Sequence, residues 1–131
     1  MDEFQEPIVF LKEESYKIIG IAMEVHRQLG GGFAEIVYKD ALVEELEMQG
    51  VPYTREQEFS VNYKGRKLPH KFYADFVVYD KIIVEVKAKK GVVDEHYSQV
   101  INYLAVSKLP LGLLLNFHGK SLEYKRIILT K

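Results

Sequence analysis

The chain has no cysteine, no long apolar run and almost no net charge, and each absence excludes something. Without cysteine there are no disulfides and no thiolate metal ligands. No run is long enough to cross a bilayer, and the start MDEFQEP is acidic, unlike a signal peptide. We therefore expect a cytoplasmic protein with no membrane contact. A formal net charge of -1 gives no global attraction to nucleic acid, so polyanion binding must come from a local patch.

The length of 131 residues, 47% of them hydrophobic, is sufficient for one compact domain with its own core and too short for two. Repeats, low-complexity tracts and linkers are absent from the sequence. We predict one domain over residues 1–131. Residues 1–12 have no clear period, and we expect them to form a loose N-terminal arm.

The clearest pattern is FYADFVVYDKIIVEVKA, at residues 72–88. Its even positions are apolar, which predicts two strands with one face against a core and a three-residue loop at residues 79–81. This register sets Asp75 opposite or nearly opposite Glu85, roughly 5 Å apart on a face shared with Lys87. The odd-numbered face carries these polar residues.

Two facing carboxylates repel unless one is protonated or a cation lies between them. A divalent metal with oxygen ligands would neutralise both acids better than Lys87 alone. The alternative is a ladder of salt bridges on an exposed sheet face. These three residues alone leave both interpretations open.

The rest of the chain predicts an α/β domain. A strand, a helix and a strand across residues 81–117 indicate a crossover connection and a parallel pair of strands. The continuously apolar run at residues 111–117 suits a strand buried on both faces. Further helices and strands are predicted, in chain order, at residues 13–29 (helix), 34–49 (helix), 53–61 (strand), 94–107 (helix) and 121–129 (strand).

Four blocks in order carry a family resemblance: VHRQLGGG, GFAEIVY, HYSQVINYL and LGLLLNF. With Asp75 and the triplet from Glu85 to Lys87, they resemble the GxxExxY family of the PD-(D/E)XK nuclease superfamily, from about residue 15 to 128. Ala74 stands in place of the proline for which the superfamily is named. The resemblance implies a restriction-endonuclease-like core, a mixed β-sheet flanked by helices.

The resemblance also implies a magnesium site, with Mn²⁺ as a substitute. Asp75, Glu85, Glu35 and the backbone carbonyl of Val86 would hold the metal. Lys87 would orient or deprotonate the attacking water and stabilise charge on the phosphate. Magnesium prefers hard oxygen ligands, which agrees with this set. The resemblance gives Gln99 a supporting role near the site.

A basic cluster precedes the central hairpin, and such a cluster binds polyanions or is only a solvated turn. We assign nucleic-acid contacts to this cluster, to two residues of the motif blocks and to one lysine in the segment after Lys87. The assigned residues are Lys64, Arg66, Lys67, Lys71, Tyr38, Lys89 and His96.

The leading hypothesis is a magnesium-dependent nuclease that hydrolyses phosphodiester bonds in nucleic acid, with DNA as the expected substrate. The alternative is a catalytically silent nuclease-fold module that binds nucleic acid or a protein partner. A third hypothesis is an enzyme acting on another phosphate ester. The sequence does not distinguish DNA from RNA, endonuclease from exonuclease, or one oligomeric state from another.

Overall fold

The computed structural model describes residues 5–91 and 94–129, with side chains described from residue 11 onward. The expected α/β fold with a mixed sheet is confirmed. In chain order the elements are α1 (Gln5–Leu29), α2 (Glu35–Met48), β1 (Tyr53–Tyr63), β2 (Arg66–Val78), β3 (Ile82–Lys87), α3 (Asp94–Ser107), β4 (Leu111–Asn116) and β5 (Glu123–Ile127).

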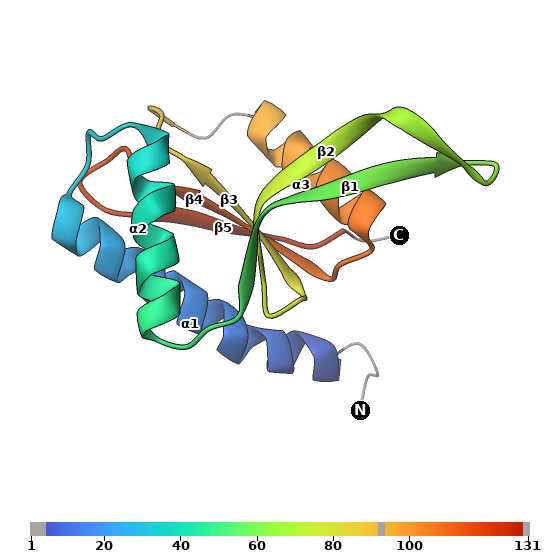
Figure 1. Ribbon diagram of the computed structural model, residues 1–131. Coiled ribbons are helices and arrows are strands. Elements are labelled where there is room, and N and C mark those ends of the chain that lie inside the picture. The colour runs from blue at the N-terminus through green and yellow to red at the C-terminus, as the bar shows by residue number, and fades with distance from the viewer. Residues whose placement is uncertain (1–4, 92–93, 130–131) are drawn as a thin grey trace.

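The five strands lie side by side in the order in which the chain makes them (Figure 1). Neighbouring strands are antiparallel except β3 and β4, which are parallel. A parallel pair needs a crossover, and α3 supplies it. The predicted strand–helix–strand unit is therefore confirmed, as is the three-residue loop between β2 and β3.

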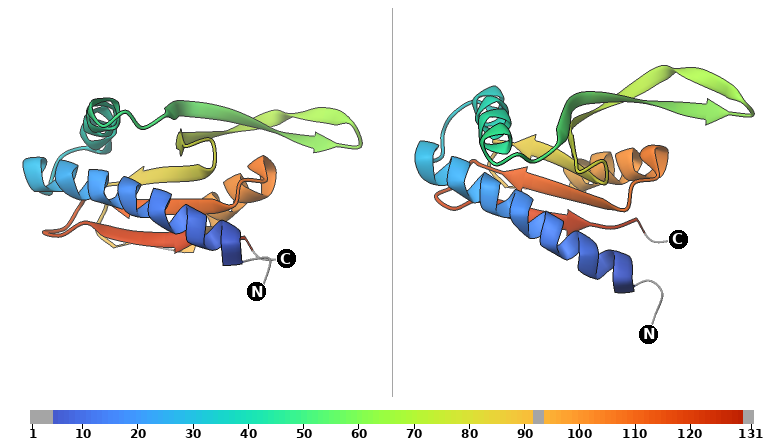
Figure 2. Two further views of the ribbon diagram at one scale, coloured as in Figure 1. Left: turned by 90° about the horizontal axis from the view of Figure 1, so that it is seen from below. Right: turned by 60° about the horizontal axis from the view of Figure 1, so that its bottom comes forward.

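Helices cover both faces of the sheet (Figure 2). One apolar cluster joins α1 and α2 to the sheet, and a second joins α3 to the opposite face. Strand β4 is buried along its whole length, as its apolar run predicts. Gly112 in β4 lets α3 approach closely, because a Cβ there would lie 2.5 Å from Val100 Cγ1.

Strands β1 and β2 continue beyond the sheet as a long two-stranded ribbon (Figure 1). Strand β2 is paired with β3 only at residues 76–78, whereas its pairing with β1 continues to Arg66. We call residues 58–73 the arm. The arm places its turn at Lys64 and Gly65 in solvent, away from the core.

Two expectations about the chain are corrected. Helix α1 begins at Gln5, eight residues before the predicted start, so residues 5–12 belong to a helix. Pro7 obscured this start in the sequence, but the first turn of a helix tolerates proline because its N–H groups have no intrahelical partner there. Residues 1–4 of the predicted arm lie outside the described residues.

The second correction concerns the central hairpin. Phe76 and Val78 pack toward α1 and α2, but Phe72 and Ala74 pack toward α3. The four therefore do not share one face as their alternation predicts. The backbone is irregular at this point, since Glu56, which flanking pairs set opposite Asp75, has a φ of 55°. The odd-numbered face is also covered, by α3, and is not a polar surface.

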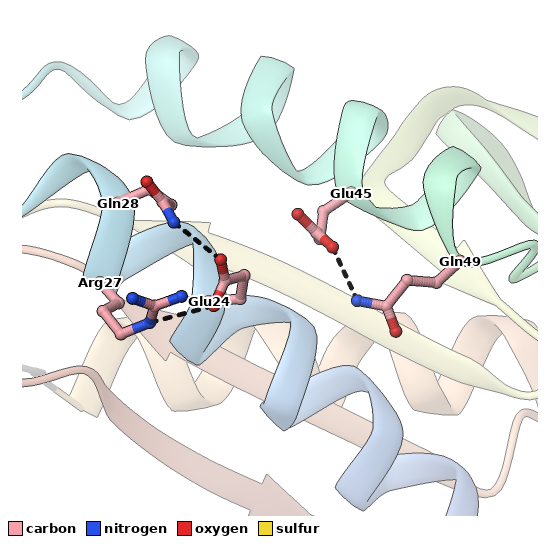
Figure 3. Close-up of polar contacts among 5 residues, drawn as sticks. All are labelled: Glu24, Arg27, Gln28, Glu45 and Gln49. Carbon is pink, nitrogen blue, oxygen red and sulfur yellow. Dashed lines mark hydrogen bonds and ion pairs between the residues drawn. The ribbon is translucent and has the colours of Figure 1, made fainter.

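The exposed sides of α1 and α2 carry short-range polar contacts (Figure 3). Glu24 accepts hydrogen bonds from Arg27 and Gln28, and Glu45 accepts one from Gln49. Such contacts stabilise a helix by a few tenths of a kcal/mol, roughly 0.2–0.5 per pair. No helix in residues 5–91 and 94–129 combines the length and apolar character needed to cross a membrane.

Candidate functional site

Asp75 and Glu85 lie on neighbouring antiparallel strands, where β2 and β3 separate. The paired register ends at Phe76 and Val84, and the two acids are the next residues in line. Each acid accepts a hydrogen bond from the opposite backbone. The N–H of Asp75 donates to Glu85 Oε1 at 2.8 Å, and the N–H of Val86 donates to Asp75 Oδ2 at 2.8 Å. The two carboxylates therefore occupy the gap that ladder hydrogen bonds would otherwise close.

Both acids are buried, with exposed fractions of 7% for Asp75 and 2% for Glu85. This excludes the exposed ladder of surface salt bridges that the sequence left open. Burial, together with the negative charge of Asp75, raises the pKa of Glu85 to about 8, so Glu85 holds a proton at neutral pH in the metal-free protein. Lys87 and Lys39 act in the opposite direction but are weaker.

A lysine from α2 reaches the same place. Lys39 Nζ lies 2.9 Å from Asp75 Oδ1 and 3.5 Å from Glu35 Oε2. Burial lowers the pKa of Lys39, but its hydrogen bond to Asp75 and the charges of Asp75, Glu35 and Glu56 outweigh this, and the net pKa is raised. Lys39 is therefore a charged ammonium between the helix acid and the strand acid.

The glycine loop before α2 fixes the direction of that helix. The Tyr38 hydroxyl donates to the Gly30 carbonyl at 2.6 Å and accepts from the Phe33 N–H at 3.2 Å. Tyr38 is fully buried and its ring stacks on Phe117 at 4.6 Å. The expectation that Tyr38 contacts nucleic acid does not hold, because its ring and hydroxyl are enclosed by the protein.

The segment after β3 is held by β4. Buried Asn116 donates from Nδ2 to the Lys89 carbonyl at 2.7 Å, and its Oδ1 accepts from the Lys89 N–H at 3.2 Å. The Phe117 N–H donates to the Lys87 carbonyl at 2.9 Å. These bonds fix the backbone at Lys87, two residues after Glu85. The positive charge of Lys87 acts to lower the pKa of Glu85, against the larger effect of burial.

His96 and Lys89 differ in exposure, although both were assigned to nucleic-acid contact. Lys89 is exposed, whereas His96 at the start of α3 is buried. Burial and the charges of Lys87 and Lys89 lower the pKa of His96, so its ring is neutral at pH 7. A contact through His96 therefore does not hold for the protein in this conformation.

A cleft of about 550 Å³ lies between the arm and α3. Gln99 and Tyr103 line it from α3, and His70, Lys71 and Tyr73 line it from β2. Burial, with the charges of Glu85 and Asp75, raises the pKa of Tyr103 to about 12, so the negative charge of both acids acts on the tyrosine that lines this cleft. Gln99 lines the same cleft, and its supporting role stays a prediction.

The four basic residues of the arm, Lys64, Arg66, Lys67 and Lys71, are exposed. Lys71 forms an ion pair with Glu58 at 3.2 Å, and Lys64 lies over the Tyr63 ring at 5.5 Å. The arm carries one acidic residue against these four. It is therefore the local basic patch that the near-zero net charge of the chain concealed.

A divalent ion requires several oxygen ligands directed at one point. In the described part of the chain, no three His, Asp or Glu side chains converge closely enough to hold a metal. Glu35 does not join Asp75 and Glu85 directly, because Lys39 lies between Glu35 and Asp75. Magnesium, however, needs only one or two carboxylates, with water and phosphate completing its shell. Buried Asp75 and Glu85 fit that requirement.

Sequence reasoning missed two residues of this region. Lys39 follows Glu35 by four residues on one helix, a spacing that places their side chains together. Asn116 is the polar end of an otherwise apolar strand, and a buried amide of this kind needs several hydrogen-bond partners. Both features are visible in the sequence. Without the fold, however, the sequence does not show that Lys39 contacts Asp75 or that Asn116 bonds to the backbone of Lys89.

Comparisons with known proteins agree with this fold. The family model described as PD-(D/E)XK nuclease superfamily matches residues 12–127. The crystal structure of SSO0001 is similar in fold, with a TM-score of 0.57 and 21% sequence identity over 70% of this chain and 48% of that one. This chain thus spans about half the length of that protein. No protein of curated function matches the chain.

The match extends from α1 to β5 and includes the buried Asp75 and Glu85, the adjoining Lys87, and the helices on both faces of the sheet. The chain belongs to the PD-(D/E)XK nuclease superfamily.

Proposed function

We propose that the protein is a metal-dependent nuclease that cleaves phosphodiester bonds in DNA, within the GxxExxY group of its superfamily. The observation that carries this proposal is the pair of buried carboxylates, Asp75 and Glu85, in the gap between β2 and β3. A fold keeps two acids in such a place at a cost in stability, because burial disfavours their charged forms. That cost is the expected mark of a site kept for chemistry.

Asp75, Glu85 and the Val86 carbonyl would hold Mg²⁺, or Mn²⁺ in its place. When bound, the ion would polarise the phosphoryl group and lower the pKa of water. Asp75 and Glu85 supply oxygens whose direction is fixed by backbone N–H groups. Lys87 would supply a compact positive charge to orient water and stabilise the phosphate, and Gln99, which lines the cleft, would support the site.

The path of the nucleic acid follows the positive charge. The arm carries Lys64, Arg66 and Lys67 in solvent, and the cleft leads from the arm toward Tyr103 and the acids. A two-stranded ribbon is one of the elements that fit the DNA major groove. We propose phosphate contacts for these three residues, for Lys71 and for exposed Lys89.

A second candidate function is a silent module that binds nucleic acid or a protein partner through the same surface. The position of Lys39 favours it, because an ammonium already neutralises Asp75 without a metal. Hydrolysis of a different phosphate ester is a third candidate. The three differ in what the protein turns over.

The experiment is a cleavage assay on single-stranded, duplex and flapped DNA and on RNA, with Mg²⁺ or Mn²⁺ and with EDTA. Cleavage that requires the metal and is lost in Lys87→Ala, but not in the matched exposed variant Lys90→Ala, supports the nuclease. Binding without cleavage supports the silent module. Turnover of small phosphodiesters alone supports the third candidate.

A further inference from the structure

The ion pair between Lys39 and Asp75 is largely buried and does not lie on the protein surface. Its side chain is 14% exposed and that of Asp75 is 10% exposed, so both partners of the 2.9 Å contact are largely removed from water. Breaking such a buried pair on one side is costly because it leaves an uncompensated charge. Lys39 therefore contributes to the site itself and is not a solvated charge on the helix face.

The two oxygens of Asp75 are both in use. The Val86 N–H occupies Oδ2, and Lys39 occupies Oδ1. A metal ion at Oδ1 must displace Lys39 or share that oxygen with it, and a metal ion at the remaining lone pair of Oδ2 would still lie a few ångströms from the same ammonium. A divalent cation and an ammonium at this separation repel, and because the pair is largely buried, solvent screens that repulsion only in part.

Glu35 is a second acidic partner for the Lys39 ammonium. Its Oε2 lies 3.5 Å from Lys39 Nζ, and Glu35 is the more exposed of the two acids, with 33% of its side chain in solvent. A lysine has four rotatable bonds in its stem, so the ammonium can leave Asp75 and remain paired with Glu35. One turn of α2 thus carries both Lys39, which pairs with Asp75, and Glu35, the alternative partner of Lys39.

We propose that Lys39 is a resident counter-ion that sets the metal affinity of the site: it neutralises Asp75 in the metal-free protein, and a divalent ion binds only by displacing it toward Glu35. The proposal rests on the proposed metal-dependent function. Glu35 accordingly acts as the acceptor of the displaced Lys39 and not as a direct metal ligand. The site binds divalent ions weakly until a phosphate, itself anionic, adds to the attraction.

Calorimetric titration with Mn²⁺, without nucleic acid, tests this. Lys39→Met keeps an unbranched side chain one atom shorter and removes its charge, and Lys17→Met on α1 removes an equally positive but exposed charge. We expect Lys39→Met to bind Mn²⁺ about tenfold more tightly than the wild type, and Lys17→Met to bind with unchanged affinity. Lys39→Arg retains the charge and should bind no more tightly than the wild type.

A second readout needs no metal. Lys39→Met should melt at a lower temperature than the wild type in EDTA, and Mn²⁺ should raise its melting temperature more than that of the wild type. If Lys39→Met does not fold, Lys39→Gln keeps a hydrogen-bond donor for Asp75 and is expected to show the same order of Mn²⁺ affinities.

Each outcome separates the two proposals. Mn²⁺ binding by the wild type with unchanged or weaker affinity in Lys39→Met and Lys39→Gln overturns the role of Lys39 and leaves the metal site standing. Binding by the variants but not by the wild type supports Lys39, and the Mg²⁺ and EDTA arms of the cleavage assay then test the metal-dependent function separately. An absence of binding in all of them at millimolar Mn²⁺, both without and with DNA present, overturns both.

Discussion

The gap between β2 and β3 and the arm beyond it are made by the same two strands but have opposite character. In the gap, Asp75 and Glu85 are nearly inaccessible to solvent and are bonded to backbone N–H groups. On the arm, Lys64, Arg66 and Lys67 are exposed. Interactions between buried charges are little screened by salt, whereas interactions of exposed charges weaken as the salt concentration rises. The gap is thus suited to chemistry and the arm to attraction.

The largest expected effect tests whether the gap performs chemistry. Lys87→Ala should lower the single-turnover cleavage rate by a factor on the order of a hundred, the usual result of losing one preorganised charge. Its Mn²⁺ affinity, measured by calorimetry, should be unchanged or slightly tighter, because a nearby positive charge is removed. Unchanged cleavage, or abolished Mn²⁺ binding, would show that the role assigned to Lys87 is wrong.

The second prediction concerns the contribution of buried Asn116 to the stability of the fold. Asn116→Ala removes the partner of four backbone groups, and buried groups left unpaired cost about 1–3 kcal/mol each in stability. We expect the free energy of unfolding, from urea titration, to fall by about 2 kcal/mol or more. Asn62→Ala on the exposed arm is the control and should be near neutral. Equal effects at the two positions would contradict the contrast between interior and arm.

The arm should change affinity and leave chemistry alone. Replacing Lys64, Arg66 and Lys67 by Gln should weaken DNA binding by about tenfold or more and reduce the slope of log affinity against log salt by about two to three. The cleavage rate at saturating DNA should stay within about twofold of the wild type. Lys17, Lys120 and Lys125 replaced by Gln remove the same charge elsewhere. A matching loss of affinity in that control would assign the effect to net charge alone.

The last expected effect concerns the pH dependence of stability in the metal-free protein. The pKa of Glu85 is about 8 in the folded state and 4.5 ordinarily, so the folded state retains a proton that the unfolded state loses. The free energy of unfolding should therefore fall as pH rises from about 4.5 to 8, by no more than about 1.4 kcal/mol per unit. The charged groups facing Glu85 are Asp75, Lys39 and Lys87. Equilibrium urea unfolding in EDTA at several pH values gives the slope.

Glu85→Gln is the control for that slope. The amide keeps an oxygen for the Asp75 N–H and cannot titrate, so the variant should show a flatter profile between pH 7 and 8. His96, whose pKa is lowered, is present in both proteins, and its contribution cancels in the difference. Parallel profiles for the two proteins would mean that Glu85 is ionised throughout.

Much of the fold was predictable because its signals are local. The apolar run of β4, the alternation in β2 and β3 and the glycine stop after α1 each predicted an element within a few residues. The pairing of Asp75 with Glu85 followed from register alone. The start of α1 was missed because propensity near Pro7 is weak, and the packing of Phe72 toward α3 was missed because alternation carries no information about where a strand twists.

The sequence identified residues that lie together in the fold, but it did not predict how they are arranged. Glu35, Asp75, Glu85 and Lys87 are all found at the end of the sheet where β2 and β3 part, but Lys39 separates the first two. A long side chain can bridge elements that sequence spacing cannot relate. Tyr38 and His96 were misassigned for a similar reason, since their burial depends on neighbours far along the chain.

The amides of Asp75 and Val86 are bonded to side chains and not to a strand carbonyl. Their protection against hydrogen exchange therefore depends on the state of two carboxylates, unlike that of the ladder amides of Val77 and Ile83 beside them. A change of protonation or of bound cation should alter the chemical shift and exchange rate of these two amides first. The fold thus contains two natural nuclear magnetic resonance reporters of its own site, readable on uniformly labelled protein without a substrate.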